Sequence, residues 1–280
     1  MSRVVRITVL AENTAQGLGL LGEHGLALWV ETGSHRVLFD TGQGLTLSHN
    51  AAALGVRLEQ AGAIVVSHGH YDHTGGLGDA LQASPGAIVY AHPAALEPKY
   101  AHMDDGTSRE IGIPSLGEDD IRSQAGDLVW TSGPAEIGEG LFVTGQVPRE
   151  NKFEDTGGPF FLDEQCRTPD PLADDQALYF ESARGTVVVL GCAHAGVVNT
   201  LQYVRSLTGG RPFHAVLGGM HLVRASDERI RRTIDSFSQL GIERLGPAHC
   251  TGMEATVRLW AAFPGQCFTC AAGTSMEFEV

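Results

Sequence analysis

The first third of the chain carries short runs rich in Val, Leu, Ile and aromatic residues, each bounded by Gly, Asn or Ser. Such runs predict β-strands. Three are expected, joined by two hairpins, at residues 3–10, 26–31 and 35–40. A helix is predicted over residues 45–54, because Leu47, Ala51 and Leu54 recur at helical spacing and Gly55 can end it. The apolar run 63–66 then predicts a buried strand.

The middle of the chain is less regular. A helix is expected after the segment 67–76, and a strand at 87–92 precedes a long polar stretch over about 97–127 that we interpret as a lid or an insertion. After two short strands, at 128–131 and 141–145, comes a segment rich in Pro, Gly and acidic residues over 148–175. Both long segments are too long to be simple connectors, and we expect them to form walls of a pocket.

The last third alternates between strand and helix patterns. Strands are predicted at 177–181, 186–191, 214–218 and 242–246, with helices starting near 197, 227 and 254. Ser226 is the expected N-cap of the second of these helices, and Gly241 its stop. Strands first and strand–helix units later predict two sheets with helices outside them. With no linker that divides it, the chain is predicted to form a single domain over residues 1–280, with long loops near 97–127 and 148–175.

Composition limits the classes of partner. The chain has 280 residues, and its 33 acidic against 19 basic residues give a net charge of −14, which repels nucleic acids and anionic membranes. Neither an apolar run of about 18–20 residues nor the pattern of a signal peptide is found, so we predict a cytoplasmic protein. The five cysteines form an odd, scattered set that agrees with a reducing compartment. A small-molecule partner is expected, and the oligomeric state is not predicted.

One short segment concentrates residues that bind metals. In "SHGHYDHTGG" the residues His68, His70, Asp72 and His73 follow directly on a buried strand. If the backbone stays extended, side chains two positions apart point the same way, so His68 and His70 can hold one ion. Asp72 and His73 lie around a turn and could hold a second ion. Imidazole with carboxylate suits zinc, iron, manganese or nickel.

Four more candidates follow apolar strand segments, where open sheets of strand–helix units place their ligand sites. They are Asp40 in "LFDTG", His194 in "GCAHAG", His221 in "GGMHL" and His249 in "GPAHCTG". The remaining histidines have no such context and are interpreted as ordinary polar residues: His24, His35, His49, His92, His102 and His214.

These motifs resemble those of a known family. "HGHYDH" matches the H-x-H-x-D-H signature of the metallo-β-lactamase-fold superfamily, and "FDTG" and "GPAH" stand where that family has them. A narrower resemblance is to the branch of 7,8-dihydropterin-6-methyl-4-(β-ribofuranosyl)aminobenzene-phosphate synthase-like proteins, through "GCAHAGVVNT", "GGMHL", "GPAHCTG" and "VPRENKFE". The resemblance implies a four-layer αββα sandwich of the α/β (α+β) class. It also implies two divalent transition-metal ions, zinc in the first place, between the two sheet edges.

Carried over to this chain, the family pattern implies two ligand sets and one orienting residue. His68, His70 and His194 would hold the first metal, Asp72, His73 and His249 the second, and Asp40 would orient a ligand histidine. The chain departs from the pattern where the family has an aspartate that bridges the two metals. At that place stands "GCAH", so Cys192 is a soft ligand, a bystander or a sign of altered metal choice.

The resemblance favours a metal-dependent hydrolase, or a transferase using the same site, acting on a small phosphate, ester or pterin-like molecule. Asp72 would position a water and move its proton, and His221 would be a further ligand or a substrate contact. Arg149 and Lys152 are weaker candidates for pairing with an anionic substrate group, the alternative being solvated loop charges.

Several alternatives stay open at this point. One is a condensing synthase of the dihydropterin type, and another is a metal-containing sensor that traps a metabolite without turnover. A nuclease is disfavoured by the acidic charge. A di-iron redox enzyme is disfavoured because such relatives carry Glu where His70 stands and are fused to a flavin-binding domain.

Overall fold

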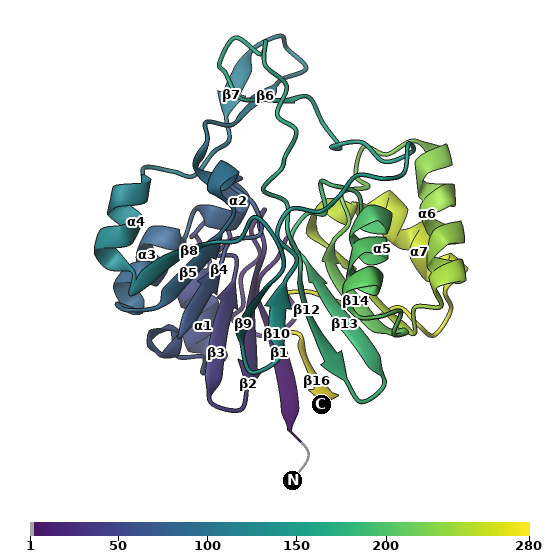
Figure 1. The fold of residues 1–280 in the computed structure, drawn as a ribbon, viewed down its shortest axis with the longest axis horizontal. Coiled ribbons are helices and arrows are strands. Elements are labelled where there is room, and N and C mark those ends of the chain that lie inside the picture. Colours follow the sequence, from purple (N-terminus) through teal and green to yellow (C-terminus); the bar gives the residue numbers. More distant parts are fainter. Residues whose placement is uncertain (1–2) are drawn as a thin grey trace.

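The computed structural model describes residues 3–280 and shows two β-sheets packed face to face (Figure 1). The first sheet has the strand order β16-β1-β2-β3-β4-β5-β8. Its strands are β1 (Val4–Ala11), β2 (Ala27–Thr32), β3 (His35–Phe39), β4 (Ala63–Val65), β5 (Ile88–Ala91), β8 (Asp127–Trp130) and β16 (Ser275–Glu279). Strands β1, β2 and β3 pair antiparallel as two hairpins, whereas β3, β4, β5 and β8 run parallel.

The second sheet has the order β15-β14-β13-β12-β10-β9. Its strands are β9 (Ala135–Gly138), β10 (Leu141–Val143), β12 (Leu178–Ser182), β13 (Gly185–Leu190), β14 (Phe213–Gly219) and β15 (Arg244–Ala248). Strands β13, β14 and β15 are parallel neighbours, so their carboxyl ends lie at one edge.

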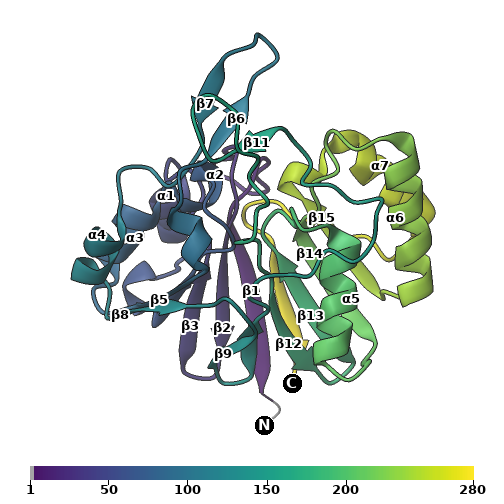
Figure 2. The same ribbon diagram turned by 45° about the horizontal axis from the view of Figure 1, so that its top comes forward.

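Helices cover the outer face of each sheet (Figures 1 and 2). On the first sheet lie α1 (Leu47–Ala53), α3 (Leu77–Ala83) and α4 (Glu118–Gln124), and the single turn α2 (Tyr71–Thr74) sits at its upper edge. On the second lie α5 (Val197–Leu207), α6 (Asp227–Leu240) and α7 (Met253–Ala262). Short 3₁₀ turns complete the fold: η1 (Leu58–Gln60), η2 (Pro93–Leu96) and η3 (His249–Thr251).

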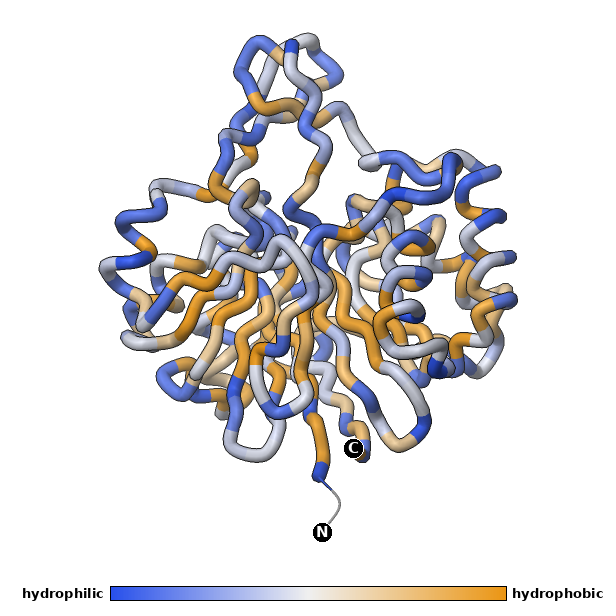
Figure 3. The backbone as a smooth tube through the Cα atoms, viewed as in Figure 1, coloured by the Kyte–Doolittle hydropathy of each residue, from blue (hydrophilic) through white to orange (hydrophobic). Residues whose placement is uncertain are grey.

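Alternation along the strands explains the four layers. In β13, Val187 and Val189 join the core between the two sheets, while Val188 and Leu190 face the helices of the second sheet. In β2, Trp29 turns the other way from its neighbours and packs toward the helices of the first sheet. Central strands such as β13 are therefore apolar on both faces, and Figure 3 colours the central strands largely as hydrophobic. The prediction of an αββα sandwich is confirmed.

The elements agree with the sequence predictions in most places. Ser226 caps α6 by accepting a hydrogen bond from the backbone N–H of Arg229, and Gly241 ends that helix in the left-handed conformation at φ 67°. Two strands of the main sheets had not been predicted, β9 and β16. In β16 the inward side chains are only Met276 and Phe278, separated by Glu277, so the apolar pattern is short. Within residues 3–280, no helix is long and apolar enough to cross a membrane.

The two long segments meet in a small third sheet. Strand β6 (Tyr100–His102) pairs with β7 (Ser108–Glu110) on one side and with β11 (Phe160–Phe161) on the other. We call these three strands the flap. It projects above the upper edges of the two main sheets (Figures 1 and 2).

Candidate metal centre

The predicted ligands follow strands from both sheets. Asp40 comes after β3 and His68 after β4, which are parallel neighbours. His194 follows β13, His221 follows β14, and His249 follows β15. Because the carboxyl ends of parallel strands meet at one sheet edge, the packing of the two sheets brings both groups together.

His68 and His70 form the first part of the site. The backbone at His70 is extended, with φ −78° and ψ 145°, so the two imidazoles lie on the same side. Nε2 of His68 is 3.1 Å from Nδ1 of His70. The ring of His194 completes a triangle, with its centroid 4.8 Å from that of His68 and 4.9 Å from that of His70. The three histidines predicted to hold the first metal are thus adjacent.

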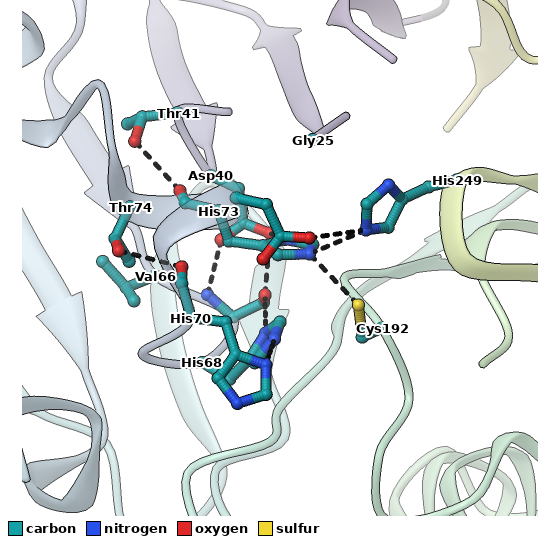
Figure 4. A network of polar contacts seen from close by, with 12 residues as sticks. Gly25, Asp40, Thr41, Val66, His68, His70, His73, Thr74, Cys192 and His249 are labelled. Carbon is teal, nitrogen blue, oxygen red and sulfur yellow. Dashed lines mark hydrogen bonds and ion pairs between the residues drawn. The ribbon is translucent and has the colours of Figure 1, made fainter. Parts of the chain in front are cut away.

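A second group lies beside the first (Figure 4). Nε2 of His73 is 3.2 Å from Nε2 of His249 and 3.1 Å from Sγ of Cys192. Asp72 extends its Oδ2 to within 3.3 Å of Nε2 of His249 and 3.2 Å of Nε2 of His24. His24 was not among the predicted site residues, because it precedes β2 in a loop without any motif.

In four of the five histidines, all but His70, the ring nitrogen that faces away from the centre has an oxygen partner. Nδ1 of His194 donates to the backbone carbonyl of Thr156 at 2.8 Å, and Nδ1 of His249 to Oδ1 of Asn13 at 2.8 Å. Nδ1 of His73 donates to Oδ2 of Asp40 at 2.7 Å. A hydrogen on the outer nitrogen leaves a lone pair on the inner one, which is the tautomer a metal ligand needs.

Asp40 orients two histidines rather than one. Besides accepting from His73, its Oδ2 accepts from the hydroxyl of Ser67 at 2.7 Å, and that hydroxyl in turn accepts from Nδ1 of His68 at 2.9 Å. The backbone N–H of Ser67 donates to Oδ1 of Asp40 at 2.7 Å. Asp40 is fully buried and has a φ of 59°, a left-handed conformation that non-glycine residues adopt at a cost. Asp40 thus adopts a costly backbone conformation at the point where it connects the two groups of histidines.

Burial sets the charge of the centre. Desolvation lowers the pKa of His70 to about 3 and holds the pKa values of His68 and His194 well below their usual range, so these rings are neutral. Burial would raise the pKa of Asp72, but the neighbouring His73 and hydrogen bonds from His24 and His249 keep it well below its usual range. Neutral imidazoles beside an ionised carboxylate are the donors that transition metals bind.

Two buried nitrogens support the fit to a metal. Nε2 of His70 and Nε2 of His194 have no hydrogen-bond partner within the part of the chain that the structure describes. Buried polar atoms without a partner are costly. In addition, three inner donors, the facing nitrogens of His73 and His249 and the sulfur of Cys192, lie close enough to share one ion.

The segment 148–175 is fastened to helix α5. The carboxylate of Glu154 is buried and accepts from the backbone N–H groups of Val198 and Asn199, each at 2.9 Å. A carboxylate at a helix N-terminus satisfies free N–H groups and complements the helix dipole. This attachment fixes the carbonyl of Thr156 on His194.

The loop cations predicted as substrate contacts lie elsewhere. Arg149 donates from Nη1 to the backbone carbonyl of His194 at 3.0 Å, and Lys152 is exposed. Neither lines the cavity described below, so the structure does not bring these two side chains to the centre. The arginines that do line the cavity are Arg109 of the flap and Arg224.

His221 stands between the centre and the loop. Its Nε2 donates to the carbonyl of Gly157 at 3.2 Å, and its ring centroid is 4.1 Å from that of His194. Nδ1 is buried without a partner among the described residues, and the residue has a φ of 44°. Gly157 itself, at φ 84°, is pressed against this ring.

A cavity of about 1070 Å³ opens over the centre. Both sheets and the flap contribute to its walls, which include Phe160, Trp260 and Phe268 as aromatic surfaces. The ring of Phe160 lies 5.0 Å from that of His70. Both long segments therefore supply pocket walls. Arg109 also stacks over Tyr71 at 5.0 Å, which connects the flap to the segment 67–76 that carries the first predicted ligands.

A buried ion-pair cluster supports the segment 67–76, which carries the first predicted ligands. Nζ of Lys99 lies 2.9 Å from Asp170 and 3.1 Å from Asp174, and all three side chains are almost fully buried. The other oxygen of Asp174 accepts from the backbone N–H of Gly69, between the two first histidines, at 2.7 Å. The sequence offered no signal for this cluster, because its members come from the two irregular segments.

Comparisons with known proteins agree with this geometry. The family model of the metallo-beta-lactamase superfamily matches residues 21–249. A 7,8-dihydropterin-6-methyl-4-(beta-D-ribofuranosyl)-aminobenzene-5'-phosphate synthase of Methanocaldococcus jannaschii is 29% identical over 262 residues, covering 90% of this chain and 89% of that protein. A second protein of that organism, described as uncharacterized, is 34% identical over 255 residues, covering 90% and 93%.

Solved structures that resemble this chain agree with the match to the family model. One described as a metal-dependent hydrolase of the beta-lactamase superfamily superposes with a TM-score of 0.83 at 31% identity, covering 99% of this chain and 100% of the other. A metallo-beta-lactamase fold protein from Bacillus subtilis, at 12% identity and a TM-score of 0.57 over 97% and 99% of the chains, shares the fold. From the matched motifs, the packing of the two sheets and these relatives, the chain belongs to the metallo-beta-lactamase superfamily.

Proposed function

We propose that this protein is a hydrolase, or a transferase using the same centre, that depends on two divalent transition-metal ions, zinc in the first place, and acts on a small molecule. One observation carries the proposal. The buried histidines converge, while the outer nitrogens of His73, His194 and His249 donate to fixed oxygen acceptors. These are Asp40, the carbonyl of Thr156 and Asn13, respectively. An ordinary polar cluster has no need of this arrangement.

The ligand sets follow the groups of the site. His68, His70 and His194 would hold one ion, and Asp72, His73 and His249 the other. When bound, two cations supply an acidified water and positive charge that stabilises developing negative charge on the substrate. Asp72 lines the cavity, where its carboxylate would orient a water and accept its proton.

His221 would act on the substrate side. It lines the cavity with Nε2 tied to the carbonyl of Gly157, and the exposed edge of its ring would contact the substrate. The aromatic walls would exclude water from an apolar or flat part of the substrate, and Arg109 and Arg224 carry charges suited to a phosphate or carboxylate group. A small phosphate, ester or pterin-like molecule fits these features.

The named relative from Methanocaldococcus jannaschii supports a second candidate, a condensing synthase of the dihydropterin type. The same centre would serve both reactions, since each needs positive charge beside a leaving group. Product analysis separates them: hydrolysis consumes water and yields two fragments, whereas condensation requires a second organic substrate. A protein that binds metals and a metabolite without turnover in either assay would be a sensor.

The experiment is a His70→Ala variant compared with the wild type by elemental analysis after purification without added metal. We expect about two ions per wild-type chain and a large loss in the variant, with loss of turnover on generic phosphodiester and ester substrates. Since His49 is exposed on α1 and lies outside the cavity and both donor groups, His49→Ala is the matched control. Full occupancy in His70→Ala would refute the ligand assignment.

A further inference from the structure

One sulfur atom belongs to both ligand groups. The donor atoms of His68, Cys192 and His194 lie within 4.8 Å of one another, and so do those of His73, Cys192 and His249. Cys192 is 3% exposed, and its Sγ is 3.1 Å from Nε2 of His73. It is the common member of the two sets, at the position where the two would meet.

The carboxylates near the centre do not lie between the two donor sets. Asp40 is engaged by His73 and Ser67 behind the rings, and Asp72 faces His249 and His24 on one side only. Asp175 turns one oxygen to the backbone N–H of Ala195 at 2.9 Å, and its other oxygen has no partner among the described residues but belongs to neither donor set. Among the described residues, no carboxylate therefore belongs to both donor sets.

The backbone around Cys192 is fixed in place. The thiol of Cys250 contacts the carbonyl of Cys192 at 3.7 Å, and Ala193 has a φ of 56°. A side chain on Gly191 would strike the hydroxyl of Ser67, which packs the two sheet edges together at this point. A metal–sulfur bond is about 2.3 Å long, and paired ions in two-metal sites are about 3.5–4 Å apart. One sulfur can therefore reach both ions.

We propose that the thiolate of Cys192 is the ligand shared by the two metals, in the place that a bridging carboxylate would otherwise fill. This inference rests on the proposed two-metal function and adds a property to it. A bridging thiolate is a soft ligand, so the centre should prefer zinc, iron or cobalt over magnesium, calcium or manganese.

Cobalt gives a direct readout that does not depend on turnover. Metal-free protein, prepared with a chelator, is titrated with Co²⁺ while thiolate-to-cobalt charge-transfer absorption is followed in the near ultraviolet. For a bridging thiolate, the wild type should gain this absorption with the first equivalent and change it again with the second. Saturation after one equivalent, with a second ion bound and no further change in the band, would overturn the bridging role.

Substitutions of individual cysteines show which sulfur produces the charge-transfer absorption band. In Cys192→Ser the absorption should disappear, and affinity for at least one ion should fall by more than about 100-fold, beyond the effect of losing an outer contact. Cys192→Asp restores a carboxylate and should bind two ions without the band, which shows that the fold survives. Cys267→Ser and Cys270→Ser are the controls and should keep it. A band that survives in Cys192→Ser, or is lost in either control, would contradict the proposal.

The two proposals fail differently. If wild-type protein binds fewer than two Co²⁺ ions, the two-metal function is wrong. If it binds two ions and shows no thiolate absorption, only the role of Cys192 is wrong.

Discussion

Replacing Lys99 with Met should destabilise the protein strongly and loosen the segment 67–76, which carries the first predicted ligands. Lys99 is 1% exposed and neutralises Asp170 and Asp174, so its removal leaves two buried carboxylates without a cation. Breaking a buried ion pair from one side costs about 3–5 kcal/mol. At about 2–4 °C per kcal/mol for large domains, the midpoint of thermal unfolding should fall by about 6–20 °C.

The pH dependence distinguishes lost charge compensation from a packing defect. Burial already raises the pKa of Asp174 against the opposing effect of Lys99, and loss of Lys99 raises it further. A folded-state pKa above the unfolded value costs stability once the pH exceeds the unfolded value, and protonation removes that cost. The deficit of Lys99→Met should therefore shrink as the pH falls from 8 toward 5.

The assay is urea unfolding of chelator-treated protein across that pH range, so that metal binding does not contribute. Arg122→Met is the matched control: Arg122 pairs with Glu118 at 2.7 Å, but both side chains are more than 40% exposed, so the loss should stay below about 1 kcal/mol. Adding Asp170→Asn and Asp174→Asn to Lys99→Met should recover part of the stability. A Lys99→Met protein within about 1 kcal/mol of the wild type, or a deficit independent of pH, would refute the reasoning.

Three further predictions concern other parts of the fold. Glu154→Gln should cost about 1–2 kcal/mol in urea unfolding, because it weakens charged hydrogen bonds to the N-terminus of α5; an unchanged midpoint would count against that anchor. Gly157→Ala should cost about 1–3 kcal/mol and displace the ring of His221 in a crystal structure, because the new Cβ would overlap it and φ is 84°; an unmoved ring would argue otherwise. Burial lowers the pKa of His214, so below about pH 6.5 the unfolded chain takes up a proton that the folded chain does not. His214→Gln should accordingly lose less stability than wild type between pH 7 and pH 5, and identical pH profiles would disprove this assignment.

The sequence was most informative where a local pattern determines the structure. Short apolar runs bounded by turn residues predicted most strands of both sheets, and the cap at Ser226 predicted the start of α6. The residues of the centre were found because each follows a buried strand, a position that sequence order reveals directly. The strand-end pattern thus identified Asp40, His194, His221 and His249 without any knowledge of their contacts.

Contacts between segments that lack a periodic pattern could not be predicted from the sequence. The acceptors for His194 and His249 are a backbone carbonyl at Thr156 and the side chain of Asn13, and neither residue type suggests a role near a metal. The support of Gly69 by Asp174 likewise joins a motif to an irregular loop. Arg149 drew attention by its charge, yet charge alone does not place a side chain in a cavity.

One stretch of backbone, residues 156–161, both shapes the pocket and positions the predicted metal ligands. Strand β11 completes the flap through Phe160 and Phe161, and only a few residues earlier the same segment holds His194 and His221 by the carbonyls of Thr156 and Gly157. An insertion there would alter specificity and metal geometry together. The hairpin of β6 and β7 contacts the segment of the predicted ligands through Arg109 and Tyr71, but among the described residues its tip makes no hydrogen bond to a predicted ligand. Substrate range should therefore diversify among relatives, and be easiest to engineer, through residues 103–107 at the tip of that hairpin.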